Sequence, residues 1–317
     1  MDFTLDETQQ VIARVAAEVL ESASPEGAWK ALGQAGMLTL AVPATLGGEG
    51  LGALEIAVLL REVGRHAAMI PALSHLATGV LPAARWGTPD LFTGDHLLSA
   101  ALNERSTPMP AWPRTTFDGG VLNGEKVGVP YADTAYRILV PVTEGIAVVD
   151  PALAKLERTP TSSGTPEFTV TFDETPVSAF WQADIGELYQ LAIVGACAMG
   201  DGLLAGALDL TTKHIGTREQ FGKPLATFQA VAGQIADVYI ASRTLHLASI
   251  SAAWRLGTGR DAASDVDVAA TWLAQEAMTA LRTCHHLHGG VGLDVTYPLH
   301  RYTSLMKDLV RYVPRPD

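Results

Sequence analysis

The stretch that decides the fold is Arg218-Glu219-Gln220-Phe221-Gly222-Lys223-Pro224-Leu225, followed by Phe228-Gln229. It lies between two long segments with helical periodicity, at about 186–215 and 228–256, so it joins two helices. Gly222 and Pro224 favour a tight turn that presents Arg218 and Phe221 together. A guanidinium suits a phosphate oxygen, and an adjacent aromatic ring can flank a planar ligand. Taken alone, the motif also fits an ordinary helix–helix loop in which Arg218 pairs with Glu219.

A second motif follows toward the C-terminus, His286-Leu287-His288-Gly289-Gly290-Val291-Gly292. Two adjacent glycines end a helix and let a ligand approach the backbone closely. No strand precedes them, so this is not a dinucleotide fingerprint of the Rossmann kind. The histidines that invite a metal interpretation are His285, His286, His288 and His300. No cluster of cysteines or acids at ligand spacing accompanies them, and we therefore predict no metal site.

Composition narrows the class of protein. The 317 residues, 48% of them hydrophobic, suffice for two or three packed units and exclude a largely disordered chain. No apolar run approaches the roughly 20 uninterrupted residues of a membrane span, and the acidic N-terminus is unlike a signal peptide. A net charge of −12 argues against nucleic-acid partners. With only Cys197 and Cys284, we expect a reducing, cytoplasmic location.

The pattern of the chain changes twice, which predicts three domains at residues 1–96, 97–183 and 184–317. The first is helical, and a glycine-rich loop at 42–52 precedes a helix that begins near Ala53. In the second, β-branched runs at 137–142, 145–150 and 168–172 alternate with turn signals. These signals are Asp118-Gly119, Asn123-Gly124 and Glu144-Gly145. The middle region therefore reads as a small antiparallel sandwich or barrel, with the proline-rich residues 108–113 as a loop.

Long helices are predicted again from about residue 186. In the second of them, Val231, Ile235, Val238 and Tyr239 fall on a single apolar stripe. A third helix is expected to begin after Ser264 as N-cap and to run to about His288. Helices, then strands, then helices define a segregated α+β chain.

Together these motifs resemble the acyl-CoA dehydrogenase family over nearly the whole chain. The matching pieces are R-x-Q-F-G-K-P-L-x-x-F-Q-x-V at 218–231, H-G-G-V-G at 288–292, Tyr297-Pro298 with Arg301-Tyr302, and the loop at 42–52. The resemblance implies an N-terminal helical domain, a middle antiparallel β domain and a C-terminal four-helix bundle. It also implies FAD as cofactor and desaturation of an acyl-CoA thioester between its α and β carbons.

In that family both motifs reach across a dimer interface and hold the adenosine and pyrophosphate half of a neighbour's FAD. The resemblance assigns this cofactor-binding role to Arg218, Gln220, Phe221, Leu225, Phe228, His286, Gly289 and Gly290. His286 stands where the family usually has Gln, and a histidine can still donate to a ring nitrogen or a phosphate.

The departures from the family concern the reacting half of the site. Its catalytic Glu aligns here with about Val313, and the alternative Glu position falls near Ala192. Neither side chain accepts a proton, so we assign no catalytic residue to this chain. Glu187 and Asp294 are the nearby carboxylates, and an ordinary helix-terminal role suits both. The family's acidic, Gly-Ser-rich stretch around the flavin ring is replaced by residues 103–106 and the proline-rich loop.

A chain that keeps only the donated half of a site needs a partner that keeps the other half. In this it resembles the smaller subunit of the α2β2 acyl-CoA dehydrogenases of actinobacterial steroid catabolism. The expected partner is a longer acyl-CoA dehydrogenase homologue that carries the catalytic Glu, and the expected substrate is a steroid-derived acyl-CoA. Two alternatives remain: a self-sufficient homo-oligomer whose base is Asp294 or Glu187, and a non-catalytic scaffold that binds CoA esters.

Overall fold

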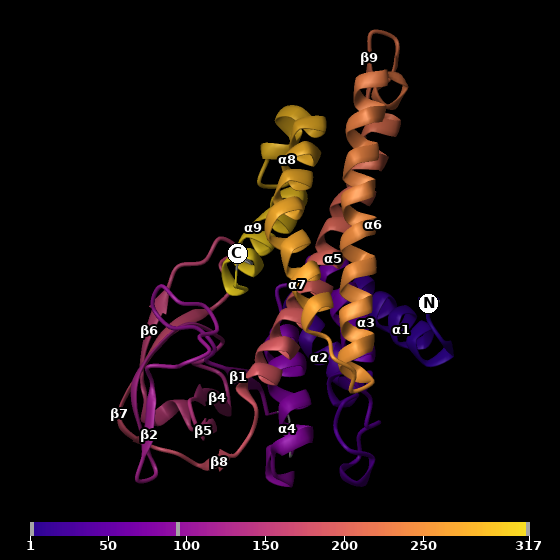
Figure 1. Ribbon diagram of the computed structural model, residues 1–317. Coiled ribbons are helices and arrows are strands. Elements are labelled where there is room, and N and C mark those ends of the chain that lie inside the picture. Colours follow the sequence, from indigo (N-terminus) through magenta and orange to yellow (C-terminus); the bar gives the residue numbers. More distant parts are fainter. Residues whose placement is uncertain (1–2, 93–95, 315–317) are drawn as a thin grey trace.

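A computed structural model describes residues 3–92 and 96–314 (Figure 1). The first region is helical, as predicted. It contains α1 (Glu7–Ser22), α2 (Ala28–Gln34) and α3 (Ala53–Arg65), then the π-helical η3 (Leu73–Val80), which continues into α4 (Leu81–Trp86). Asp6 caps α1 by accepting a hydrogen bond from the Gln9 amide, and the Gln9 side chain accepts one from the Asp6 amide. The loop before α3 contains only short 3-10 turns, so it positions α3 without adding a further long helix.

Two four-stranded sheets form the middle region. Their strand orders are β1-β4-β5-β8 and β2-β3-β7-β6. The first comprises β1 (Leu98–Ala100), β4 (Arg137–Val142), β5 (Gly145–Val149) and β8 (Ala179–Trp181). The second comprises β2 (Thr116–Asp118), β3 (Val121–Pro130), β7 (Glu167–Pro176) and β6 (Lys155–Thr159). The pairs are antiparallel except β1–β4, which is parallel because the chain leaves the first sheet for β2 and β3 before it returns.

The three predicted turn signals have different outcomes. Asp118 ends β2, and Gly119 and Gly120 follow with φ of 57° and 88°, as a tight hairpin requires. The Glu144-Gly145 turn joins β4 to β5 as predicted. The Asn123-Gly124 prediction is wrong, because Gly124 lies inside β3 at an irregularity in its pairing with β7. A Cβ at this glycine would come within 2.8 Å of the Thr115 backbone, so the glycine serves close packing.

Four long helical segments make up the C-terminal region. They are α5 (Ile185–Thr217), α6 (Gln229–Gly257), the continuous run of α7 (Ala263–Thr271), η7 (Trp272–Glu276) and α8 (Ala277–His288), and α9 (Leu299–Tyr312). The predicted N-cap Ser264 is wrong: α7 begins at Ala263, whose amide donates to the Asp261 carboxylate. The predicted stripe on α6 is also split. Val238 is buried, but Tyr239 is 58% exposed, since neighbouring residues point about 100° apart on a helix.

One core spans the N-terminal helices and the C-terminal bundle, and a second lies between the two sheets. Among the described helices, α5 is long and apolar enough to cross a membrane by composition, although Asp201 interrupts it; 83% of its most apolar window is buried. Figure 1 shows α5 and α6 extending side by side beyond the rest of the molecule. The secondary structure changes between Phe92 and Leu98 and again between Trp181 and Ile185, while the exact domain limits stay a prediction.

Candidate functional site

The Arg218–Leu225 motif forms the tip of the α5–α6 hairpin. The chain leaves α5 at Arg218, whose amide donates to the His214 carbonyl, and passes through the short strands β9 (Glu219–Gln220) and β10 (Lys223–Pro224). The Leu225 amide then donates to the Arg218 carbonyl at 2.9 Å, which closes the loop. The sequence therefore predicts this junction correctly. In Figure 1 the tip is the part of the molecule that stands farthest from the β domain.

Phe221 is displayed at the end of this tip in an unfavourable backbone conformation. Phe221 and Gly222 have φ of 52° and 78°, the pair of positive values that a two-residue hairpin turn requires. A phenylalanine in the left-handed region costs about 1–2 kcal/mol. The Phe221 ring is 92% exposed, so burial of the side chain does not offset this cost. The ring lies edge-on to Phe228 at 6.3 Å, and Lys223 Nζ lies 4.3 Å from the centre of the Phe228 ring. Such strain at an exposed aromatic points to a ligand-facing role.

Arg218 is exposed and has no ion-pair partner in the described part of the chain. The alternative in which it pairs with Glu219 is therefore not what the structure contains. Gln220 beside it is also exposed, whereas Leu225 and Phe228 are half-buried at the base of the tip. The tip thus presents a free guanidinium and an amide above an apolar base, which suits an anionic ligand with a planar ring.

The second motif ends α8 and exposes its backbone. Gly289 has φ of 59°, and a Cβ built on Gly289 or Gly290 would meet no protein atom within 4 Å. His286, one turn earlier, is exposed as well. Both glycines and His286 are therefore open to a ligand from the solvent side. Among described residues, no group of three or more His, Cys, Asp or Glu is placed to hold a metal ion.

A histidine stack joins the two motifs at the same end of the helices. His214 near the end of α5 stacks on His288 at the end of α8, with ring centres 4.4 Å apart. The Nδ1 of His288 lies 2.8 Å from the Cys284 carbonyl, and its Nε2 lies 3.0 Å from the Tyr297 hydroxyl. Burial lowers the pKa of both histidines, and Arg218 lowers that of His214 further. The stack is therefore neutral near pH 7, and Lys213, Arg218 and Lys223 carry positive charge near it.

Sequence reasoning missed this stack. Both histidines stand at helix ends beside a predicted ligand motif, His214 one turn before Arg218 and His288 directly before Gly289. That placement is the one signal from which the stack was predictable.

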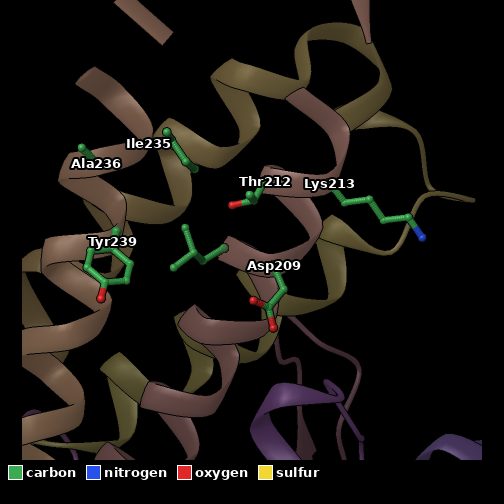
Figure 2. Close-up of a pocket in the computed structure, with 7 residues that line it drawn as sticks. Asp209, Thr212, Lys213, Ile235, Ala236 and Tyr239 are labelled. Carbon is green, nitrogen blue, oxygen red and sulfur yellow. The ribbon is translucent and has the colours of Figure 1, made fainter. Parts of the chain in front are cut away.

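An open groove runs between α5 and α6 below the tip. It has a volume of about 740 Å³ and is lined by Leu208, Asp209, Thr212, Lys213, Ile235, Ala236 and Tyr239. In Figure 2, Tyr239, Ile235 and Ala236 of α6 face Thr212 and Asp209 of α5 across it. Asp209 also pairs with Arg65 at 2.7 Å. The large apolar side chains of α6 near this groove, Tyr239 and Ile240, are more than half exposed.

The chain's own cleft, between the middle domain and the C-terminal helices, is closed. The resemblance places two elements around a flavin ring: the stretch that begins at Asn103 and the position of Val313. Here Asn103 Nδ2 donates directly to the carbonyl of Tyr312, beside Val313, at 3.3 Å. The Tyr189 hydroxyl of α5 donates to the Pro110 carbonyl at 3.1 Å, so the proline-rich loop is fixed to the other wall.

A buried ion pair between Glu104 and Lys126 stabilises the same region. Glu104 accepts hydrogen bonds from the amides of Arg114 and Thr115 and from Lys126 Nζ, which is fully buried 2.9 Å away. Burial lowers the pKa of Lys126. The pKa of Glu104 is also lowered: burial opposes this, but hydrogen bonds from Lys126 and the two amides prevail. This carboxylate is therefore an ionised structural anchor with its acceptors used.

The two carboxylates considered as alternative bases, Glu187 and Asp294, each have a local partner. Ala192 and Val313 are buried, as expected for apolar replacements. Glu187 pairs with Arg85 at 2.5 Å on the side of the loop at 42–52, and burial raises its pKa. Asp294 is fully exposed at the end of η8 (Gly289–Leu293) and accepts from the Thr296 amide, a bond that lowers its pKa. Both carboxylates have local structural roles, and the assignment of no catalytic residue stays a prediction.

Comparison with known proteins identifies the fold family. A model described as Acyl-CoA dehydrogenase, N-terminal domain, matches residues 4–91, and one described as Acyl-CoA dehydrogenase, C-terminal domain, matches residues 191–307. The chain belongs to the acyl-CoA dehydrogenase family. It is 44% identical to acyl-CoA dehydrogenase FadE28 of Mycobacterium tuberculosis, over 100% of this chain and 96% of FadE28. The predicted family, its three-part α+β fold and its flavin cofactor FAD are thereby confirmed.

Solved structures of acyl-CoA dehydrogenases have the same fold as this chain. A variant of the Tcur3481–Tcur3483 steroid ACAD has a TM-score of 0.90 at 31% identity, covering 98% of this chain and 95% of that chain. The ChsE4–ChsE5 complex of M. tuberculosis has a TM-score of 0.89 at 29% identity, covering 98% and 94%. Butyryl-CoA dehydrogenase of Megasphaera elsdenii shares the fold at 18% identity, with a TM-score of 0.86 over 99% and 97% of the two chains.

Proposed function

We propose that this acyl-CoA dehydrogenase chain is the cofactor-lending subunit of a heteromer, in which a longer homologue carries the catalytic Glu. The observation that carries the proposal is the contrast between two regions. The tip of the α5–α6 hairpin presents Arg218 without an ion-pair partner and Phe221 in a strained, exposed conformation. The chain's own cleft is instead closed by the hydrogen bond from Asn103 to the Tyr312 carbonyl. A site with its nucleotide end open and its reacting end closed works only when another chain supplies the reacting end.

The residues at the tip fit the nucleotide half of FAD. Arg218 offers its donors to phosphate oxygens, Gln220 and His286 offer further hydrogen-bonding groups, and Phe221 flanks a planar ring. The open backbone at Gly289 and Gly290 lets a ligand approach closely. FAD, when bound, supplies the acceptor for the β hydride of the acyl-CoA. The residues of this chain hold and orient its nucleotide end, and the partner's carboxylate removes the α proton.

The chain's own cleft does not fit a flavin ring. Its walls meet through the Asn103–Tyr312 hydrogen bond, and the cavity beside α9 has a volume of only about 80 Å³. We therefore route no chemistry through it. A steroid-derived acyl-CoA is the proposed substrate class, which the 31% identity to the Tcur3481–Tcur3483 steroid ACAD supports. We also keep the cytoplasm as the proposed location, in line with the free thiols of Cys197 and Cys284.

Co-expression tests the proposal. Purified alone, the chain is expected to lack the flavin absorption band near 450 nm. Purified with a longer acyl-CoA dehydrogenase homologue, it is expected to give a yellow complex that oxidises an acyl-CoA. The self-sufficient alternative predicts instead that the isolated chain binds stoichiometric FAD and that Asp294→Ala or Glu187→Ala abolishes its turnover. The scaffold alternative predicts a colourless complex that still binds CoA esters.

A further inference from the structure

The stack of His214 on His288 connects α5 to α8 directly below the two ligand motifs. The ring centres are 4.4 Å apart, and the ring planes meet at 21°. The two helices pack against each other in the bundle. Beyond the stack the chain becomes exposed on both sides, at residues 216–218 after α5 and at residues 289–290 after α8. The stack therefore lies at the boundary between the packed bundle and its exposed end.

The His288 ring is held in a single orientation. It is 4% exposed, and its Nδ1 lies 2.8 Å from the Cys284 carbonyl oxygen. A carbonyl oxygen can only accept, so Nδ1 carries the proton of the neutral ring. Nε2 then accepts a hydrogen bond from the Tyr297 hydroxyl at 3.0 Å. Both nitrogens are thus used within the chain, and one face of the ring packs against His214.

The double-glycine turn is fixed to the same part of α8. His285, one turn before His288, places its Nδ1 3.0 Å from the Gly292 carbonyl oxygen and its Nε2 2.7 Å from the Thr303 hydroxyl of α9. Gly292 is buried, and a Cβ at this position would come within 2.9 Å of the His288 Cβ. Gly292 therefore lets the turn pack closely against α8. The open backbone at residues 289–290 is consequently held at a defined place relative to the His288 ring.

On the other side of the stack, His214 is joined to Arg218 by one turn of helix. The Arg218 amide donates to the His214 carbonyl at 2.8 Å. The His214 ring is half-buried and makes no hydrogen bond with any residue that the structure describes, so stacking is the contact that holds it. Because the hydrogen-bonded helical turn is stiff, the place of the His214 ring sets the place of the Arg218 backbone.

We propose that His214 and His288 are positioning residues for FAD. Their stack fixes the distance between Arg218 and the open backbone at residues 289–290, so that both contact the same nucleotide. This inference rests on the proposed function, in which these two motifs bind the adenosine and pyrophosphate half of FAD. Groups that are held at the correct spacing before binding lose less entropy when the ligand binds. An aromatic pair changes an equilibrium constant by about 3- to 10-fold, which sets the size of the expected effect.

The FAD dissociation constant of the co-purified complex, measured by equilibrium dialysis, tests this role. His214→Ala is expected to raise the dissociation constant about 3- to 10-fold. His214→Phe keeps a ring that stacks on His288 and is expected to stay within about 2-fold of wild type, because no nitrogen of His214 is used. The matched control is His66→Ala, which removes another half-buried histidine at a helix end, in the N-terminal region, and leaves the dissociation constant unchanged.

A double variant separates a positioning role from a direct contact with FAD. If His214 acts through Arg218, the combination of Arg218→Ala with His214→Ala binds FAD within about 2-fold of Arg218→Ala alone. Effects of the two changes that multiply show an independent contact and overturn the inference. Wild-type affinity in His214→Ala overturns it as well, and so does a loss in His214→Phe as large as that in His214→Ala.

The same series distinguishes failure of this inference from failure of the proposed function. If Arg218→Ala weakens FAD binding but His214→Ala does not, only the positioning role is wrong. If Arg218→Ala itself binds FAD as tightly as wild type, the proposed function is wrong.

Discussion

Arg311 on α9 donates two hydrogen bonds to the carboxylate of Glu167 on β7, at 2.8 and 2.6 Å. The guanidinium and the carboxylate are 144 positions apart in the chain and lock the last helix onto the β domain. Hydrogen bonding to Glu167 raises the pKa of Arg311. One turn away, Asp308 accepts from the amides of Ser162 and Ser163. These bonds hold α9 against the β domain at two points.

Removing the arginine is expected to destabilise the chain. Arg311→Ala leaves the buried Glu167 carboxylate with only the Thr159 hydroxyl, at 3.5 Å, so we expect a loss of about 1–3 kcal/mol in unfolding free energy. Because the Arg311 side chain is half exposed, the lower end of that range is expected. Arg105→Ala, which breaks the exposed pair with Glu125, is the control and costs at most about 0.5 kcal/mol. If urea unfolding gives the same loss of unfolding free energy for both variants, the Arg311–Glu167 pair does not stabilise the chain as proposed.

Phe221 is expected to lower the stability of the isolated chain and to strengthen the binding of FAD. Asparagine tolerates the left-handed conformation better than phenylalanine, so Phe221→Asn raises the unfolding free energy of the isolated chain by about 0.5–1 kcal/mol. The same change weakens FAD retention by the complex, because the ring that flanks the ligand is lost. Phe228→Asn is the control, since Phe228 has an ordinary φ of −84° and packs with Lys223; it destabilises the chain. Thermal unfolding and flavin absorbance measure both effects. A Phe221→Asn variant that retains FAD as well as wild type contradicts the assigned role.

Acid sensitivity is expected from His75, which is buried beneath Trp29. Burial lowers the pKa of His75 from 6.5 to about 4, so the native chain keeps it neutral where the unfolded chain takes up a proton. Stability is therefore unaffected by this group above about pH 6.5. It falls as the pH drops from 6.5 to 4, by up to about 3 kcal/mol, and levels off below. His75→Gln removes this contribution, so its unfolding free energy declines less steeply than that of wild type across the same range. Parallel pH profiles for the two proteins would refute the assignment.

Local sequence patterns predicted the elements but not the long-range contacts. The spacing of apolar residues changes from the helical period of 3.6 to the strand period of 2 and back, which predicted the three regions. Gly222 and Pro224 predicted the turn at the tip. The helix predicted to begin near Ala53 is α3, which begins at that residue. The Arg311–Glu167 and Asn103–Tyr312 contacts join residues far apart in sequence, so local sequence patterns cannot predict them. They are the contacts that join the β domain to the last helix.

Two errors show where local rules fail. Asn123-Gly124 has the composition of a hairpin turn, but close approach to Thr115 places the glycine inside a strand. Tyr239 was placed on a buried stripe, but α6 lies at the edge of the bundle and buries a narrower face. Its exposed side chains line the groove of Figure 2, which is open in the single chain. Exposed apolar side chains of α6 therefore look, in sequence, like part of an ordinary helical core.

The central claim is that the hairpin tip of this chain holds the nucleotide end of an FAD whose reactive ring lies in a partner. The most direct test is the FAD content of the intact complex when Arg218→Ala is introduced in this chain alone. Arg243→Ala, which removes an exposed arginine of α6, is the control. We predict that the Arg218→Ala complex assembles but loses most of its FAD on gel filtration, at least tenfold relative to the control, and that Arg218→Lys is intermediate. A fully assembled Arg218→Ala complex with the same FAD content as wild type would contradict the account.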